Sequence, residues 1–231
     1  MTRSLVSLCA EQGRQVAEVL HRSRAVLNHG FTPDEHLRSA MSAKKRKELR
    51  RQRARLEKED AVSIRRTRGT ERLDKWIGEF LALELRGWKG GRGSALASDP
   101  RNEQLFRQSL AGAAALGRLE RIAMYCGDRP IAMLATFLAE PGAYSFKTSF
   151  DEDFARFSPG LLLQVENLAL LEDPVLEWCD SCAAVDHPMI ERIWRDRREM
   201  VWLSIGVGRG LRRKMGELWA KIEAWREERR A

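Results

Sequence analysis

The apolar pattern changes after residue 117, and this change restricts the fold more than any other feature of the chain. The runs LERIAMYC, PIAMLATFLA and AYSFKTSF predict three strands, because apolar residues are grouped there in segments of strand length. A Gly-Asp pair after the first run predicts a tight hairpin turn, and a Pro-Gly pair precedes the third run. The three runs therefore predict the antiparallel part of a sheet.

Helices and further strands surround these three runs. From residue 61 onward, the expected order is strand, helix, helix, the three strands, helix, strand, helix and strand. This order predicts an α/β fold of the α+β type, with a mixed sheet. The additional elements are expected at 61–66, 69–88, 99–116, 149–170 (a loop and then a helix), 174–181, 186–197 and 199–206, with a glycine-rich basic loop at 89–99.

Helical segments are also expected at both ends of the chain. Apolar residues recur at helical spacing from Leu5 to Leu27, and Thr32 followed by Pro33 predicts the start of a short second helix. Ser42 is expected to cap a basic helix over 44–58. After residue 207, an amphipathic helix carries Leu and Trp on one face, which could pack on the core or on a second copy of the chain.

The charge of the chain favours an acidic partner. Its 231 residues carry a net charge of +8, which suits nucleic acid, a phosphorylated cofactor, an anionic glycan or an anionic membrane surface. The basic helix 44–58 has two interpretations: a solvated helix with one thin contact stripe, or an arm that binds the phosphates of tRNA or other RNA. No apolar run is long enough for a membrane span, and we expect a cytoplasmic protein.

The four cysteines do not predict a disulfide scaffold in a chain of this length. Cys179 and Cys182 have CxxC spacing and could form half of a zinc site with His187. A structural zinc site normally needs four ligands, and the remaining cysteines are isolated in sequence. We therefore expect no metal.

The segment SFDEDFARFSPGLLLQVENLAL predicts a helix start that could bind phosphate. Ser158 can cap the helix, Pro159 fits the first helical position, and Gly160 lets an anion approach the backbone. The first N–H groups of a helix lack internal partners and favour anions, and Arg156 could add a charge-assisted contact. The alternative is an ordinary capped helix start.

Several blocks of the chain resemble GNAT acyltransferases. The segments LELRGWKGGRGSAL, YCGDRPIAMLATF, YSFKTSFDEDFARFSPGLLL and WCDSCAAVDHPMIERIW look like successive blocks of the CelD/BcsL-type acetyltransferases of cellulose and exopolysaccharide biosynthesis. That subgroup is similar to the Fem-type (FemAB-like) aminoacyltransferases of peptidoglycan. The resemblance covers about residues 40–205, and the N-terminal GNAT-like half usual in the family is absent. It implies a helical arm at 1–59, a GNAT-like domain at 60–206 and a C-terminal helix at 207–231.

The resemblance also implies a donor site. In GNAT enzymes the helix after the fourth strand presents its N-terminus to the pyrophosphate of acetyl-CoA, and the corresponding residues here are Arg156, Ser158, Pro159, Gly160 and Leu161. The usual loop is Q/R-x-x-G-x-G/A, whereas this chain has a single, displaced glycine. This departure leaves two donors open, acyl-CoA first and aminoacyl-tRNA second.

Candidate catalytic and acceptor-binding residues follow from the same comparison. The resemblance places Asp180 and Asp186 where an acceptor would enter, and His187 suits a general base, although a lone histidine more often has no catalytic task. It also implies that the strands 143–150 and 175–181 separate and leave main-chain N–H groups free for the acyl carbonyl. The acceptor-binding candidates are Trp88, Lys89, Lys147, Asp151 and Glu166.

The resemblance therefore implies an enzyme that transfers an acetyl or acyl group from acyl-CoA to an amine or hydroxyl, on a polysaccharide or cell-envelope precursor. Two alternatives remain. One is a Fem-like transferase that uses aminoacyl-tRNA. The other is a non-catalytic GNAT-like module that binds RNA or an envelope-synthesis partner through the basic helix.

Overall fold

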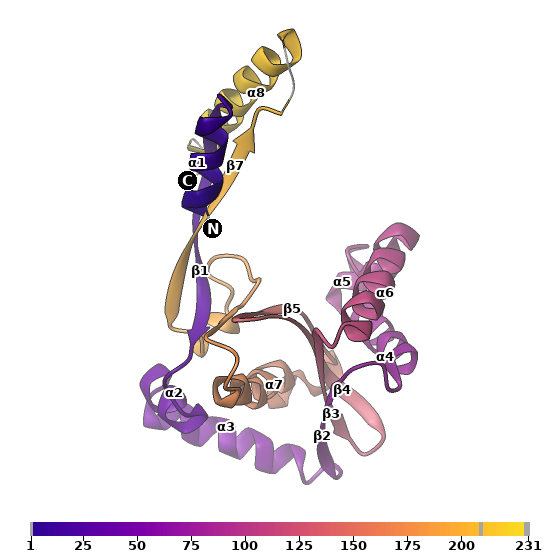
Figure 1. Ribbon diagram of the computed structural model, residues 1–231. Helices are drawn as coiled ribbons and strands as arrows, with labels where there is room; N and C mark the ends of the chain where they lie inside the picture. Colours follow the sequence, from indigo (N-terminus) through magenta and orange to yellow (C-terminus); the bar gives the residue numbers. More distant parts are fainter. Residues whose placement is uncertain (1, 208–209, 229–231) are drawn as a thin grey trace. The chain divides into compact units, whose positions relative to one another are not determined.

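The structure of the protein is a computed structural model that describes residues 2–207 and 210–228. It contains helices and strands in alternation, shown in Figure 1. The helices are α1 (Thr2–Glu11), α2 (Pro33–Ala40), α3 (Ala43–Leu56), α4 (Leu73–Arg86), α5 (Trp88–Gly91), α6 (Pro100–Ala115), α7 (Pro159–Asn167) and α8 (Leu211–Glu228). The strands are β1 (Val16–Asn28), β2 (Val62–Arg68), β3 (Leu119–Cys126), β4 (Arg129–Ala139), β5 (Gly142–Phe150), β6 (Trp178–Asp180) and β7 (Asp196–Ile205).

Contacts divide the chain into two units. The larger unit is Ala25–Asp196, and the smaller one combines residues 1–24 with residues 197–231. Within the smaller unit, the first part of β1 runs beside β7 as a two-stranded ribbon (Figure 1). The predicted domain limits at 59/60 and 206/207 stay a prediction.

The sheet has the order β2-β3-β4-β5-β6-β1-β7. Neighbours from β2 to β5 are antiparallel, β5 and β6 are parallel, and β6 is antiparallel to β1. The predicted meander over residues 119–150 and the mixed sheet are therefore confirmed.

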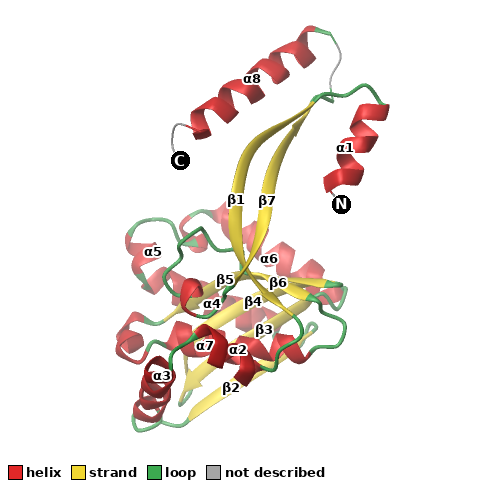
Figure 2. Ribbon diagram, turned by 90° about the vertical axis from the view of Figure 1, so that its left-hand side faces the viewer, coloured by secondary structure: helices red, strands yellow, loops and turns green. Residues whose placement is uncertain are grey.

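The two faces of this sheet are covered by different helices of the larger unit. The helices α4, α5 and α6 lie on one side, and α2, α3 and α7 on the other (Figures 1 and 2). Because side chains alternate along a strand, Ala123 and Tyr125 of β3 pack with α4 and α6, whereas Ile122 and Met124 pack toward α3 and α7. Each fully buried Leu or Ile contributes roughly 1.5–3 kcal/mol by leaving water.

The helix starts follow the local capping rules. Thr32 forms a capping box with Glu35 at the start of α2, Ser42 accepts from Lys45 N at the start of α3, and Asp99 accepts from Arg101 N at the start of α6. These three predicted starts are confirmed.

Four predicted elements are wrong or only partly right. Of the strand predicted over 174–181, only Trp178–Asp180 forms a strand. The helix over 5–27 ends at Glu11, after which Gly13 has a φ of +61° and residues 16–28 form β1. Pairing with β6 at residues 26–28 and with the neighbouring strand β7 outweighs the helical spacing of the apolar residues. The segment 186–197 forms only a short 3-10 turn at Ile190–Arg192. The segment 89–99, predicted as a loop, overlaps with α5, where Gly90 leaves no room for a Cβ against the carbonyl of Leu85.

The apolar side chains of α8 remain largely exposed within the smaller unit. Leu211, Leu218 and Trp219 each keep more than 60% of their surface accessible. The prediction that this face packs on the core or on a second copy stays a prediction. Among the described helices, none is long and apolar enough to cross a membrane.

Candidate active site

The candidate site lies where β5 and β6 separate. The two strands pair only from Gly142 with Trp178 to Tyr144 with Asp180. The next backbone N–H, that of Ser181, donates instead to the carbonyl of Ala25 at 3.1 Å. A cavity of about 790 Å³, here called the strand cleft, opens beyond this point. It is lined by residues of β5, by the segment after β6, by the start of α7, and by α5.

The start of α7 forms one wall of the strand cleft. Ser158, Pro159, Gly160 and Leu161 all line it. The first N–H with a helical partner is that of Leu162, which donates to the Ser158 carbonyl at 3.0 Å, so the N–H groups before it have no partner within the helix. This wall is therefore suited to an anion.

Two expectations about this helix start need revision. Ser158 has a left-handed backbone (φ 54°, ψ 51°) and its side chain makes no capping hydrogen bond, so the predicted side-chain cap is wrong. Gly160 has a packing reason that the sequence did not indicate. A Cβ there would lie 3.0 Å from Met189 Sδ and 3.2 Å from Phe150 Cδ1.

A buried carboxylate supports the opposite wall. Glu84, at the end of α4, is 2% exposed. Its Oε1 lies 2.9 Å from Lys89 Nζ and 3.2 Å from Lys147 Nζ, and its Oε2 accepts from Leu96 N at 2.8 Å. Burial opposes ionisation, but the Leu96 hydrogen bond and the two ammonium groups outweigh it, so the pKa of Glu84 is lowered.

Lys89 and Lys147 both line the strand cleft, together with Trp88. The backbone N–H of Trp88 donates to Glu152 Oε1 at 2.6 Å, and the Arg92 guanidinium lies 5.1 Å from the centre of the Trp88 ring. The structure thus brings these three predicted acceptor-binding residues together. Sequence reasoning missed Glu84, because a glutamate on an amphipathic helix gives no sign of burial.

Only one of the three predicted catalytic residues lines the strand cleft. His187 does so, and the N–H of Ile190 points at its Nδ1 over 3.5 Å. Asp180 is 1% exposed and accepts from Cys182 N at 2.7 Å, and Asp186 is an exposed residue with a φ of +61°. Neither aspartate lines the strand cleft.

Three further predicted site residues have partners outside the strand cleft. Arg156 pairs with Glu59 at 3.0 Å, so it does not reach the anion wall. Asp151 is buried and accepts from Arg129 Nε at 2.8 Å. Glu166 accepts from Arg53 Nη1 at 3.3 Å. Arg192, which the sequence analysis did not single out, lines the strand cleft.

The basic helix α3 has mixed surroundings. Arg53 is bound to Glu57 and Glu166, and Arg51 to Glu48. A cavity of about 410 Å³ between α2, α3 and α7 is lined by four arginines and by apolar side chains. The predicted RNA contact stays a prediction.

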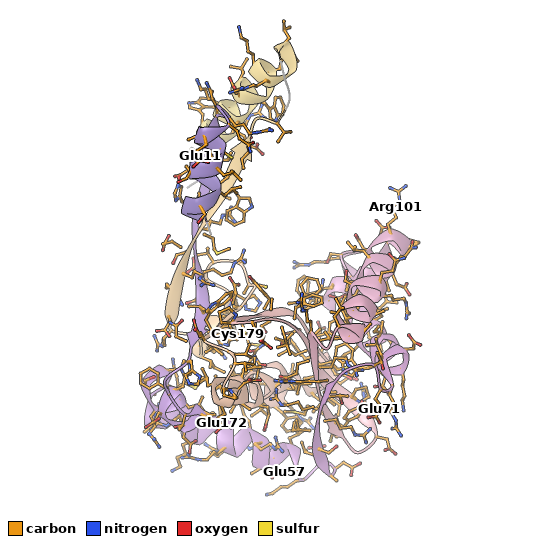
Figure 3. The ribbon with its side chains drawn as sticks, in the orientation of Figure 1. Glu11, Glu57, Glu71, Arg101, Glu172 and Cys179 are labelled. Carbon is orange, nitrogen blue, oxygen red and sulfur yellow. The ribbon has the colours of Figure 1, made fainter. Side chains whose placement is uncertain are left out.

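The described residues contain no group of three or more His, Cys, Asp or Glu side chains that could hold a metal ion. Cys179 is buried within β6 of the larger unit (Figure 3). Burial raises the pKa of its thiol well above the ordinary value, which opposes the thiolate form that zinc requires.

The family is defined by a sequence comparison. The profile described as "Acetyltransferase (GNAT) domain" matches residues 43–187, more than half of the 231 residues. The chain therefore belongs to the GNAT acetyltransferase domain family. A comparison with curated proteins gives no match. The CelD/BcsL subgroup, with its cellulose and exopolysaccharide roles, stays a prediction.

Solved structures agree with this fold. FemX has a TM-score of 0.56 at 11% identity, over 86% of this chain and 65% of that chain. The C-terminal (DUF2156) domain of a protein described as a lysylphosphatidylglycerol synthetase, from Agrobacterium fabrum, has a TM-score of 0.54 at 12% identity, over 95% of this chain and 69% of that chain. A protein of unknown function from Bacteroides thetaiotaomicron has a TM-score of 0.56 at 9% identity, over 87% and 66%. The chain spans about two thirds of the length of each, and at these identities the likeness shows the fold alone.

Proposed function

We propose that the strand cleft transfers an acyl group from acyl-CoA to an amine or hydroxyl acceptor. The observation that carries this proposal is the opening between β5 and β6, which has the anion-suited start of α7 on one side and two lysines on the other. Acyl-CoA, when bound, supplies a thioester whose acyl group is open to attack. The family match supports this donor.

The residues of α7 suit the phosphate end of such a donor. The N–H groups at Gly160 and Leu161 lie before the first helical hydrogen bond and belong to residues that line the strand cleft. A phosphate held there gains from both the free donors and the helix dipole. Beyond Tyr144, the edge of β5 that faces β6 has no strand partner among the described residues, so its main chain is suited to donate to an acyl carbonyl.

Lys89 and Lys147 suit an acceptor that carries an acidic group. Glu84 contributes one negative charge against their two positive charges, so this wall keeps a net positive charge. A cell-envelope precursor with a carboxylate or phosphate matches it. We assign the proton transfer from the acceptor to His187, because it is the one member of the predicted catalytic set that lines the strand cleft.

Calorimetric titration with acetyl-CoA tests the donor. We expect a Kd of roughly 1 μM to 1 mM, and we expect it to weaken at least tenfold in Gly160→Glu, because the new carboxylate repels the donor phosphates. Gly112→Glu on α6 is the matched control, since Gly112 is exposed and has no neighbour within 4 Å of an added Cβ. Absence of binding to the unmodified protein contradicts the acyl-CoA donor.

The second candidate function uses aminoacyl-tRNA as the donor. The arginine-lined cavity beside α3 favours it, and FemX shares the fold. Binding of tRNA should then fall steeply as salt rises, with a log–log slope of about −0.9 for each phosphate neutralised. A flat salt dependence contradicts this donor and equally the RNA-binding module.

A further inference from the structure

A second cavity lies on the opposite face of the sheet from α7. It has a volume of about 440 Å³ and is lined by residues of β2, β3 and α4, and we call it the Arg121 cavity. Its floor is formed where Thr67 of β2 pairs with Arg121 of β3, and Arg65 with Ala123. It shares no lining residue with the strand cleft.

Arg121 is a buried cation whose hydrogen bonds go to neutral groups. Arg121 as a whole is 1% exposed. The Nη2 group donates to the carbonyl oxygens of Gly69 at 3.0 Å and Glu71 at 2.8 Å. Its Nε has no hydrogen-bond partner within the described chain. Burial lowers the pKa of the guanidinium, and the nearby charge of Glu71 opposes this shift.

Trp76 adds a second unpaired donor at the same cavity. Its indole Nε1 is buried and likewise lacks a partner among the described residues, while its ring stacks on Phe80 at 5.3 Å. The Arg121 guanidinium lies 6.0 Å from the centre of the Trp76 ring. Buried donors in native proteins are nearly always satisfied. Both donor atoms are shielded from solvent while their residues line one cavity, so an acceptor bound in the cavity can satisfy them when the neighbouring side chains shift.

The charged residues around the Arg121 cavity, Arg121 included, favour an anion. Five basic and two acidic residues line it. Of the two acids, Glu79 already accepts from Tyr125 Oη at 2.8 Å and lies 3.8 Å from Lys75 Nζ. Of the five basic residues, Arg66 donates to the Glu120 carboxylate and to the Glu166 carbonyl. The lining basic residues are Arg65, Arg66, Arg72, Lys75 and Arg121.

We propose that the Arg121 cavity binds a small molecule through a carboxylate or phosphate group that accepts hydrogen bonds from Arg121 Nε and Trp76 Nε1. The cavity volume lies within the ~300–1,000 Å³ typical of small-molecule sites. Tyr125 and Ala123 line the same cavity and contact the apolar part of the ligand. This site is separate from the acyl-transfer site.

The indole N–H of Trp76 is the direct probe. In protein labelled with ¹⁵N-tryptophan, the seven tryptophans give separate indole signals, and Trp76→Phe identifies the relevant one. Inorganic phosphate, acetate and chloride are titrated separately to about 50 mM at constant ionic strength, far above a Kd of ~1 mM. We expect a saturable shift of the Trp76 signal with phosphate or acetate and none with chloride. Whichever of the two anions binds identifies the group.

Variants at the cavity mouth complete the test. Arg65 and Lys75 are exposed, so Arg65→Gln and Lys75→Gln should fold normally and weaken binding about threefold to tenfold. Arg101→Gln, at the exposed end of α6 (Figure 3), is the control and should leave binding unchanged. The proposal is overturned if the Trp76 signal does not move, if chloride moves it equally, or if Arg101→Gln weakens binding as much as Lys75→Gln.

Discussion

Glu84 and Arg121 are both buried charges beside cavities, and their surroundings differ in one respect. Glu84, at the strand cleft, has two ammonium groups and a backbone N–H on its oxygens. Arg121, at the Arg121 cavity, has two neutral carbonyl oxygens and an unpaired Nε. A buried charge is costly unless it is paired and hydrogen-bonded. The described residues supply hydrogen-bond partners and opposite charges to Glu84, whereas they leave the Nε of Arg121 without a hydrogen-bond partner.

This difference separates two uses of a buried charge. Glu84 fixes Lys89 of α5 and Lys147 of β5 on one wall of the strand cleft, so its role is to position residues that line the proposed active site. Arg121 holds the turn between β2 and α4 through hydrogen bonds to the carbonyls of Gly69 and Glu71, and its Nε remains without a partner among the described residues. The first arrangement is expected to be sensitive to mutation, and the second to added anions.

Glu84→Gln should have the largest effect on stability. It leaves two partly buried lysines without their counter-charge, and breaking a buried pair costs roughly 3–5 kcal/mol. Because each lysine side chain is still about a quarter exposed, we expect a loss of about 2–3 kcal/mol in urea unfolding at pH 7. Glu103→Gln, which removes an exposed i,i+4 pair with Arg107, should cost less than about 0.5 kcal/mol. Equal losses in the two variants would show that burial of Glu84 has no special role.

The same carboxylate predicts a pH signature. The pKa of Glu84 is lower in the folded chain than the ~4.3 of an unfolded glutamate, so the unfolded state binds the proton first as the pH falls. Its stabilising contribution is complete above about pH 5 and is lost as the pH decreases through the folded pKa. The difference in unfolding free energy between the wild type and Glu84→Gln should therefore shrink as the pH falls from about 5 through the folded pKa of Glu84. A constant difference over this range contradicts the pairing.

The sequence predicted the walls of the strand cleft better than their support. Pro159 and Gly160 were found because a helix start has a local signature, and Trp88, Lys89 and Lys147 lie in blocks that resemble the family. Glu84 and Arg121 were missed, since burial of a charge depends on which strand or helix lies opposite. In the same way, β1 looked helical from its apolar spacing, and its pairing with β6 and β7 made it a strand.

The other wall of the strand cleft should respond to Gly160→Ala. The new Cβ would press on Met189 and Phe150, which we expect to cost about 1–2 kcal/mol and to weaken binding of acetyl-CoA. Gly112→Ala is the matched control. An added Cβ there meets no neighbour, so this helical substitution should stabilise the chain by about 0.5–1 kcal/mol. Thermal unfolding of both variants gives the comparison, and a gain in stability for Gly160→Ala contradicts it.

Arg121→Met should cost less than Glu84→Gln. The substitution deprives two carbonyl oxygens of a donor but also removes a buried charge that has no carboxylate partner in hydrogen-bond contact, and replacing a buried charge by an apolar side chain is often close to neutral. We expect a loss of about 1 kcal/mol in anion-free buffer. Phosphate or acetate should widen the gap to the wild type, because only the wild type is then stabilised by the bound anion. A loss as large as that of Glu84→Gln would remove the distinction between the two sites.

The smallest effect is expected at Tyr125, which lines the Arg121 cavity. Burial raises the pKa of its phenol to about 12, with further contributions from the hydrogen bond and the charge of Glu79. The chain has two tyrosines, so Tyr144→Phe leaves Tyr125 as the single phenol whose ultraviolet absorbance can titrate. Absorbance at 295 nm should then rise with a midpoint near pH 12 while circular dichroism reports a folded chain, against ~10 for a free phenol. A midpoint near pH 10 in folded protein would mean that Tyr125 is open to solvent. Water would then reach the floor of the Arg121 cavity and could satisfy the unpaired donors in place of a ligand.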